Sequence, residues 1–117
     1  MSKKTVVATD ANGRTSSRVP TDTHLTRISQ DKETNARGLR ILQLCDEMNL
    51  AIVNGTELES PHRGSYTSHQ HNGKAVVDYI LVSQALCMLI KNLSIEVRPV
   101  SKKDQWSDHS KLSLVIS

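Results

Sequence analysis

With 117 residues the chain has the size of one domain, and its apolar fraction of 37%, with no Phe and one Trp, requires an aliphatic core. Its net charge of +3 permits contact with polyphosphates, although an ordinary solvated surface is the simpler explanation. No apolar stretch reaches the length of a membrane span or signal peptide, and both cysteines, Cys45 and Cys87, lie in apolar runs, which predicts an intracellular protein with reduced thiols.

The first half of the chain predicts a strand, a long loop and a helix. Residues 5–8 are β-branched and apolar, as strands are. Residues 10–24 are rich in Asp, Asn, Gly, Ser and Pro, the residues of turns and loops. A helix follows, because Thr34 or Asn35 can cap its first turn. Its apolar residues recur at helical spacing on one face: Ile41, Leu42, Cys45 and Met48.

The second half of the chain is dominated by strand signals. The predicted elements, in chain order, are a short strand at 50–53, a loop at 57–64, a strand at 65–68, a hairpin turn at 72–73, a strand at 75–83, a helix at 83–90, and strands at 95–100 and 112–116. The segment "AVVDYILVS" at 75–83 is apolar on both faces, so we expect it to be central and buried. Strands alternate with helices early and cluster late, which indicates the mixed α/β group of folds.

Asp78 is a carboxylate inside the most apolar strand of the sequence. A buried carboxylate needs a partner, and His109, which precedes the last strand, is the natural candidate. An aspartate that holds an imidazole fixes its tautomer and stabilises its charged form. The alternative is that Asp78 pairs with a surface Lys or Arg or caps a loop, and the strand context favours neither interpretation.

Two further places combine polar groups with strand ends. Asp108 precedes His109 and points the other way in an extended segment, so its carboxylate can hold a divalent ion such as Mg²⁺. Asp10 and Asn12 end the first strand two residues apart, which places both on the same face. One can accept a proton from water while the other donates to an oxyanion. Taken alone, Asp and Asn after a strand are also ordinary loop residues.

His69 and His71 have a spacing that could bind zinc. No Cys-x-x-Cys motif or further Cys/His pair accompanies them, so a solvated turn is the simpler interpretation. The lysine pairs at 3–4 and 102–103 are likewise interpreted as solvated surface.

Four short motifs occur in order along the chain: "TDAN", "GSYTS", "VVDYILVS" and "WSDHSKL". In this order they resemble the endonuclease/exonuclease/phosphatase family, whose usual ending is Gly-Asp-x-Asn, a strand with a threonine, a strand with Asp before Tyr, and Ser-Asp-His. Residues 27–56 also look like the retrotransposon-type branch, with an Asn-x-x-Gly helix start, a mid-helix Cys and a strand that ends in Asn-Gly. The resemblance covers almost the whole of residues 1–117.

The resemblance implies a magnesium- or manganese-dependent hydrolase that cleaves phosphodiesters of DNA. It implies that Asp10 is the base that activates or orients the attacking water, and that Asn12 positions the nucleophile and the phosphate. It assigns Asp108 to the metal ion. These three residues would form the metal and nucleophile side of the site.

The phosphate side of the implied site rests on three other residues. His109 would contact the scissile phosphate and stabilise its developing charge, and Asp78 would orient the imidazole. Thr67 matches the threonine of the family's strand and is implied to support substrate binding. By this resemblance, Asp and His precede the last strand because they share one phosphate-cleaving site.

The chain departs from the family pattern in three ways. Thr9 stands where the family has Gly, and Ala11 stands where it often has Phe. The family's first half supplies another sheet and a metal-binding Glu, which nothing before Thr5 can supply here. We therefore expect the C-terminal half of a four-layer α/β sandwich, with a mixed, mostly antiparallel sheet and helices on one face. Half a sandwich leaves an apolar sheet face uncovered, which predicts self-association or a partner segment.

Three functions are compatible with this reasoning. The first is metal-dependent hydrolysis of DNA, incomplete without the missing half. The second is an inactive remnant that serves at most as a binding or interaction module, and the third is a phosphatase of small phosphate esters within the same family. An upstream segment or separate chain that supplies the missing Glu would distinguish the first from the second. No membrane partner is expected.

Overall fold

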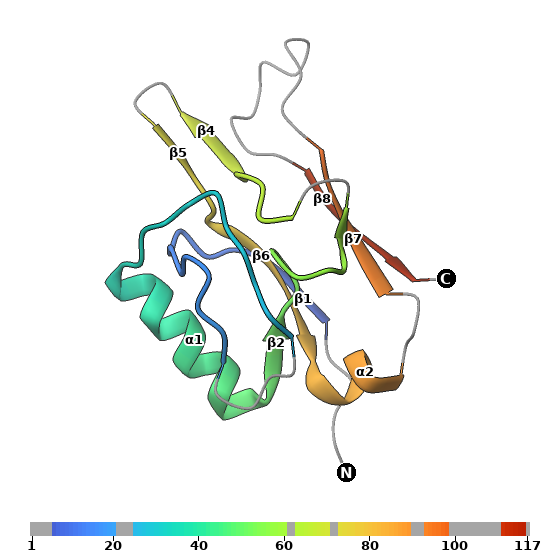
Figure 1. The fold of residues 1–117 in the computed structure, drawn as a ribbon. Coiled ribbons are helices and arrows are strands. Elements are labelled where there is room, and N and C mark those ends of the chain that lie inside the picture. The colour runs from blue at the N-terminus through green and yellow to red at the C-terminus, as the bar shows by residue number, and fades with distance from the viewer. Residues whose placement is uncertain are drawn as a thin grey trace.

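The computed structural model of the chain describes residues 6–20, 25–60, 63–70, 73–89, 93–98 and 111–116, and these form an α+β fold (Figure 1). The strands are β1 (Val6–Asp10), β2 (Leu50–Ile52), β3 (Glu59–Ser60), β4 (Ser68–Gln70), β5 (Gly73–Ala75), β6 (Asp78–Ser83), β7 (Leu93–Arg98) and β8 (Lys111–Ile116). The helices are α1 (Ala36–Met48) and α2 (Gln84–Leu89). Within this described part of the chain, neither helix has the length and hydropathy needed to cross a membrane.

Strand β6 is the centre of the main sheet, whose order is β1-β6-β2 with both pairings antiparallel. All six residues of β6 are buried, as its apolar sequence predicted. The register places Asp10 directly opposite Asp78 and Leu50 opposite Ser83. The last residue of β1 and the first residue of β6 therefore meet at one end of the sheet.

The remaining strands form two smaller sheets. In the order β3-β7-β8, β3 runs parallel to β7 and β7 runs antiparallel to β8, while β4 and β5 form an antiparallel hairpin. Strand pairing is thus mixed and mostly antiparallel, as expected, but it is divided among three sheets. Strand β3 lies in a segment predicted to be loop, and its Glu59 side chain accepts hydrogen bonds from the amides of Gly55 and Gly64.

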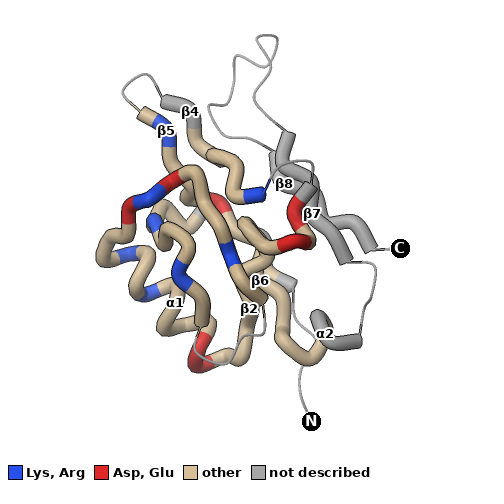
Figure 2. The backbone as a smooth tube through the Cα atoms, in the orientation of Figure 1, with Lys and Arg blue, Asp and Glu red and all other residues tan. Residues whose placement is uncertain are grey.

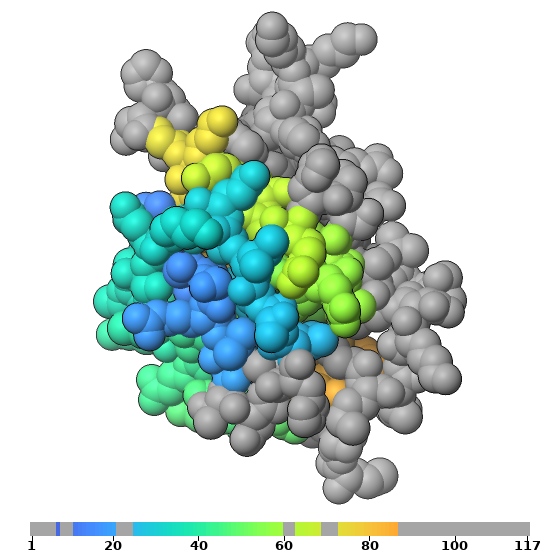
Figure 3. Space-filling view, in the orientation of Figure 1, coloured from blue at the N-terminus to red at the C-terminus, as the bar shows by residue number. Residues whose placement is uncertain are grey.

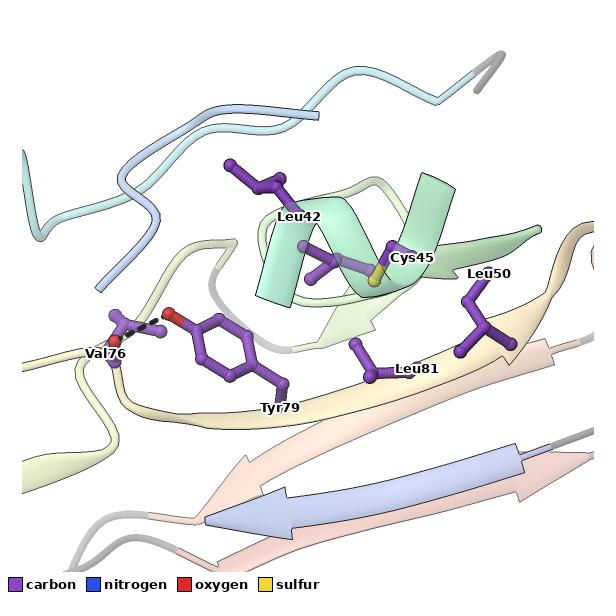
Figure 4. Close-up of a cluster of buried hydrophobic side chains, with 7 residues drawn as sticks. Leu42, Cys45, Leu50, Val76, Tyr79 and Leu81 are labelled. Atoms are coloured by element: carbon purple, nitrogen blue, oxygen red, sulfur yellow. Dashed lines mark hydrogen bonds between the residues drawn. The ribbon is translucent and has the colours of Figure 1, made fainter. Parts of the chain in front are cut away.

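Helix α1 covers one face of the main sheet and forms the core with it (Figure 4). Asn35 caps the helix as one of the two predicted residues, and its Oδ1 accepts a hydrogen bond from the Gly38 amide at 2.9 Å. Leu42 and Cys45 pack in one cluster with residues of β2 and β6, namely Leu50, Ile52, Tyr79 and Leu81. Each large side chain buried here stabilises the fold by about 1.5–3 kcal/mol.

Met48 was predicted on the buried face of this helix but is 55% exposed. It is the last residue of α1, immediately before the chain reverses at the left-handed residue Asn49 and enters β2. The buried positions of the helix are Gly38, Leu42 and Cys45, so its inward face begins one turn earlier than the sequence pattern indicated.

The other face of β6 is buried as well. Ile80 is 2% exposed and Val82 is 0% exposed, and both alternate with the helix-facing residues Tyr79 and Leu81. Strand β8 lies in contact with β6. Both faces of β6 are therefore covered within this chain, so the open sheet face expected from a missing half is not found on this strand.

The predicted strand at 75–83 is interrupted between β5 and β6. At Val76 and Val77 the backbone amides leave the ladder and bond side chains instead, with Asp31 Oδ2 at 3.0 Å and Thr67 Oγ1 at 2.9 Å. Hydrophobic pattern alone does not reveal this change of partner. The strand expected at 65–68 begins only at Ser68, although the Thr67 amide still donates to the Ala75 carbonyl at 3.0 Å.

Two N-terminal segments, residues 11–20 and 25–35, lie side by side on one face of the molecule (Figure 3). Arg14 donates from Nε and Nη2 to the two carboxylate oxygens of Asp31 at 2.8 and 2.7 Å. Asp31 is 2% exposed and also accepts from the amides of Glu33 and Val76. Burial alone would raise the pKa of Asp31, but the hydrogen bonds from Arg14 and the two amides outweigh it and hold the pKa below its ordinary value.

The hydroxyl of Tyr79 attaches the first of these segments to β6. It lies 2.7 Å from the Gly13 carbonyl oxygen and 2.9 Å from that of Val76, and it accepts a hydrogen bond from Thr15 Oγ1 at 3.2 Å. Tyr79 is fully buried, and burial raises the pKa of its hydroxyl. Hydrogen bonds to the buried Tyr79 hydroxyl thus hold residues 13–15 of the N-terminal segment against β6.

The thiol of Cys45 should be unreactive in the folded chain. It is a free cysteine, 0% exposed, and burial raises its pKa to about 11. Because the thiolate is the reactive form, we expect iodoacetamide at about pH 8 to alkylate it at least ~100-fold more slowly in buffer than in concentrated guanidinium chloride. Mass spectrometry of the Cys45 peptide measures both rates, and equal rates would contradict the buried position.

Candidate functional site

The candidate site is the end of the main sheet where β1 finishes and β6 begins. The antiparallel register makes Asp10 and Asp78 direct partners across the two strands, from motifs 68 positions apart by number. Residues directly opposite in an antiparallel pair are close neighbours. Asp78 is a buried residue, 9% exposed, and of Asp10 the structure describes the backbone only.

Thr67 supports this end of β6 through its backbone. Its side chain is fully buried, and Oγ1 accepts hydrogen bonds from the amides of Val77 at 2.9 Å and Asp78 at 3.1 Å. Thr67 was predicted to support substrate binding. These contacts fix the peptide that leads into Asp78, and the role of Thr67 in substrate binding stays a prediction.

Asn12 lies just beyond the end of β1. The Ala11 amide still donates to the Val77 carbonyl at 3.0 Å, and then the chain turns at Asn12, whose φ is 51°. Asn tolerates this left-handed conformation better than most residues. Strand alternation, which predicted that Asp10 and Asn12 share a face, does not extend to Asn12. Asn12 is exposed, and it follows directly on Ala11, whose amide bonds the residue before Asp78.

Two predicted site residues, Asp108 and His109, lie outside the described residues. The described chain resumes at Lys111, the first residue of β8, and β8 pairs with β7 while contacting β6. The proposed pairing of His109 with Asp78 therefore stays a prediction. Of the histidines considered for zinc, His71 lies outside the described residues and His69 is described only as a backbone position in β4.

A magnesium site is not complete among the described side chains. In this part of the chain, no group of three or more His, Cys, Asp or Glu side chains could hold a metal ion. Mg²⁺ requires near-octahedral oxygen ligation. The described donors do not fit the ion by themselves, and a metal site would need Asp108 together with donors beyond the described residues.

In the part of the chain that the structure describes, charged residues are mostly concentrated on the N-terminal segments and α1 (Figure 2). Asp31 and Arg27 are the buried charged residues of these elements. Arg27 is 7% exposed and donates to three uncharged oxygen atoms: those of the Asn54 carbonyl, the Thr15 hydroxyl and the Arg18 carbonyl. Its burial lowers the pKa of the guanidinium. A buried arginine bonded in this way holds three backbone segments in fixed relation.

Sequence reasoning missed three residues that build this region. Asn54 was interpreted as half of a turn pair, but its side chain is 2% exposed and bonds β6 at two positions. Arg27 and Asp31 lie in a segment that showed no clear periodicity, so nothing marked them as buried. A signal did exist at Asn54, because the family resemblance includes a strand that ends in Asn-Gly.

Comparison of the chain with known proteins gives no assignment. No protein-family model, no curated protein and no solved structure matches it.

Proposed function

We propose that this chain carries part of a phosphodiester-hydrolysing site that acts on DNA. The observation that supports the proposal most strongly is the register of β1 and β6. It brings Asp10 and Asp78, which come from two of the four family-like motifs, to one end of one sheet. Thr67, from a third motif, bonds the amide of Asp78. Motifs that meet in space support a shared site better than motifs that merely follow in order.

In this proposal each residue acts through its position at the sheet end. Asp10 accepts a proton from the attacking water, and the exposed Asn12 donates to a phosphate oxygen from the turn that follows. Asp78 is the buried carboxylate that orients His109. Magnesium or manganese belongs to the proposal through Asp108 and would stabilise charge on the phosphate. The remaining donors come from a partner segment or a second chain.

One observation favours a second candidate function. The absence of a three-donor metal group among the described residues is what an inactive binding module would also show. The two functions differ in turnover, because a binding module holds DNA without cutting it. Measuring both DNA binding and DNA nicking on the same purified chain therefore distinguishes the two functions.

Nicking of supercoiled plasmid DNA by the purified chain, with Mg²⁺ or Mn²⁺, tests the proposal. We expect slow, metal-dependent nicking that falls by at least about 100-fold in both Asp10→Asn and Asp78→Asn. The first substitution removes the general base, and the second removes the carboxylate that orients His109. Glu57→Gln changes an exposed carboxylate away from the paired strands and should leave the rate unchanged.

The outcomes separate the three functions. Nicking that survives both aspartate substitutions would reveal a contaminating nuclease and overturn the proposal. DNA binding in a gel-shift assay without nicking would instead support the binding module. Release of phosphate from p-nitrophenyl phosphate, without nicking, would assign the chain to small phosphate esters.

A further inference from the structure

The pairing of β2 with β6 ends just before it reaches Asp78. Val53 is the last residue of this edge whose amide bonds β6, donating to the Ile80 carbonyl at 2.9 Å. The chain then turns away, with the Thr56 amide and hydroxyl both donating to the Val53 carbonyl at 3.1 and 2.6 Å. The turn would leave buried backbone groups of β6 without a strand partner, and buried groups of this kind are almost always paired.

The side chain of Asn54 takes the place of the missing strand. Its Nδ2 donates to the Asp78 carbonyl at 2.9 Å, and its Oδ1 accepts from the Ile80 amide at 2.9 Å. A carboxamide presents one donor face and one acceptor face, as a peptide group does, so it extends the ladder by one further pair of bonds. Asn54 is 2% exposed, so it makes both bonds away from bulk solvent.

Arg27 fixes the backbone from which this carboxamide projects. Its Nε donates to the Asn54 carbonyl at 2.7 Å, while Nη1 bonds Thr15 Oγ1 at 3.2 Å and the Arg18 carbonyl. The guanidinium fork is planar and rigid, so it holds Asn54 at a set distance from the N-terminal segment. Asn54 is therefore constrained from both sides, by β6 and by Arg27.

We infer that Asn54, held by Arg27, is a positioning residue for Asp78, and this inference rests on the proposed role of Asp78 in the site. Thr67 bonds the amide of Asp78 and Asn54 bonds its carbonyl, so both ends of this residue's backbone are fixed by side chains. The direction of the Asp78 side chain follows from that backbone. Asn54 thereby sets how the carboxylate stands opposite Asp10 without touching substrate.

Asn54→Asp is the sharpest test, because it replaces the donor Nδ2 with an oxygen of nearly the same size. The new oxygen faces the Asp78 carbonyl and repels it, while the acceptor for Ile80 is kept. Asn35→Asp is the matched control, since Asn35 uses only its Oδ1, as an acceptor from Arg14 and Gly38. Leu42→Ala supplies a second control that lowers stability through the core under α1 without contacting Asp78.

The first measurement is NMR of the isotope-labelled 117-residue chain at a temperature where every variant is folded. We expect Asn54→Asp to move the backbone carbonyl and side-chain Cγ resonances of Asp78, because the lost bond is the one from Asn54 Nδ2 to the Asp78 carbonyl. Neither control should do so. Unchanged Asp78 resonances in Asn54→Asp would overturn the inference, whether or not the chain cleaves DNA.

The second measurement is the kinetics of plasmid nicking. A positioning role predicts that Asn54→Asp lowers kcat by about tenfold or more with little change in KM, because a small displacement of a reacting group lowers turnover strongly. Leu42→Ala should keep kcat once the folded fraction is corrected. If kcat in both Asn54→Asp and Leu42→Ala falls only in proportion to the folded fraction, Asn54 has a structural role alone. If the wild-type chain does not nick DNA, the proposed function fails, and the NMR result alone decides whether Asn54 positions Asp78.

Discussion

Replacing Asp31 with alanine should lower the free energy of unfolding by about 3 kcal/mol. Removing one partner of a buried ion pair typically costs about 3–5 kcal/mol, and the lower end applies because the Arg14 side chain is 27% exposed. The substitution also leaves the Val76 amide, which is buried, without its acceptor. Urea denaturation followed by circular dichroism measures the loss.

Glu33→Gln is the control for this prediction. Glu33 pairs with the same arginine at 2.9 Å but is 73% exposed, so its loss should change stability by less than about 0.5 kcal/mol. Similar losses in the two variants would show that the burial of Asp31 does not matter.

The same carboxylate predicts how stability depends on acid. Because the pKa of Asp31 is lowered in the folded chain, its contribution is complete above the pKa of an unfolded aspartate, near 3.9. It is lost as the pH falls through the lower folded value. Between about pH 5 and pH 3 the wild-type chain should lose stability more steeply than Asp31→Asn, which has no charge to lose. An equal dependence of stability on pH in the wild-type chain and in Asp31→Asn would contradict the lowered pKa of Asp31.

Gly38→Ala should destabilise the chain even though alanine is the better helix former. In an exposed helix the change would gain about 1 kcal/mol. Here a Cβ atom at Gly38 would lie 1.8 Å from the carbonyl oxygen of Arg14 and 2.4 Å from its carbonyl carbon. Both are backbone atoms and cannot rotate away, so α1 must move off the N-terminal segment. We expect a loss of about 2–3 kcal/mol in urea denaturation.

Gln43→Ala on the same helix separates this clash from helix propensity. Gln43 is exposed, and alanine there should change stability by no more than about 0.5 kcal/mol. A stabilised Gly38→Ala variant would mean that the close approach of α1 and Arg14 does not exist in solution.

The sequence predicted the elements best where hydrophobic periodicity was long. Strand β6 has six residues and helix α1 has thirteen, and the sequence pattern predicted both elements. Leu42, Cys45 and every residue of β6 are buried as expected. Strand β3 has two residues, too few for any periodicity, and its partner is distant in sequence. Strand β3 forms because it pairs with β7, and the residues around β3 carry no information about that distant partner.

The candidate site was predictable as residue types but not as geometry. Asp78 stood out because a carboxylate is unusual in an apolar strand, and the register then placed Asp10 beside it. The supporting contacts of Asn54 and Thr67 were not predictable. Both bond backbone atoms of β6, and such bonds depend on where a neighbouring strand stops, which composition does not encode. Side-chain bonds to a backbone leave no pattern of charge or hydrophobicity.

The bonds of Tyr79 also constrain when the N-terminal segment can assemble. Thr15 and Gly13 precede this tyrosine by 64 and 66 positions. At a synthesis rate of about 5–20 residues per second, the segment waits on the order of several seconds on the ribosome before its anchor exists. Closing so long a loop also adds an entropic barrier that local helix formation in α1 does not face. During that interval the segment is exposed to chaperones and proteases, so it is protected only well after its own synthesis.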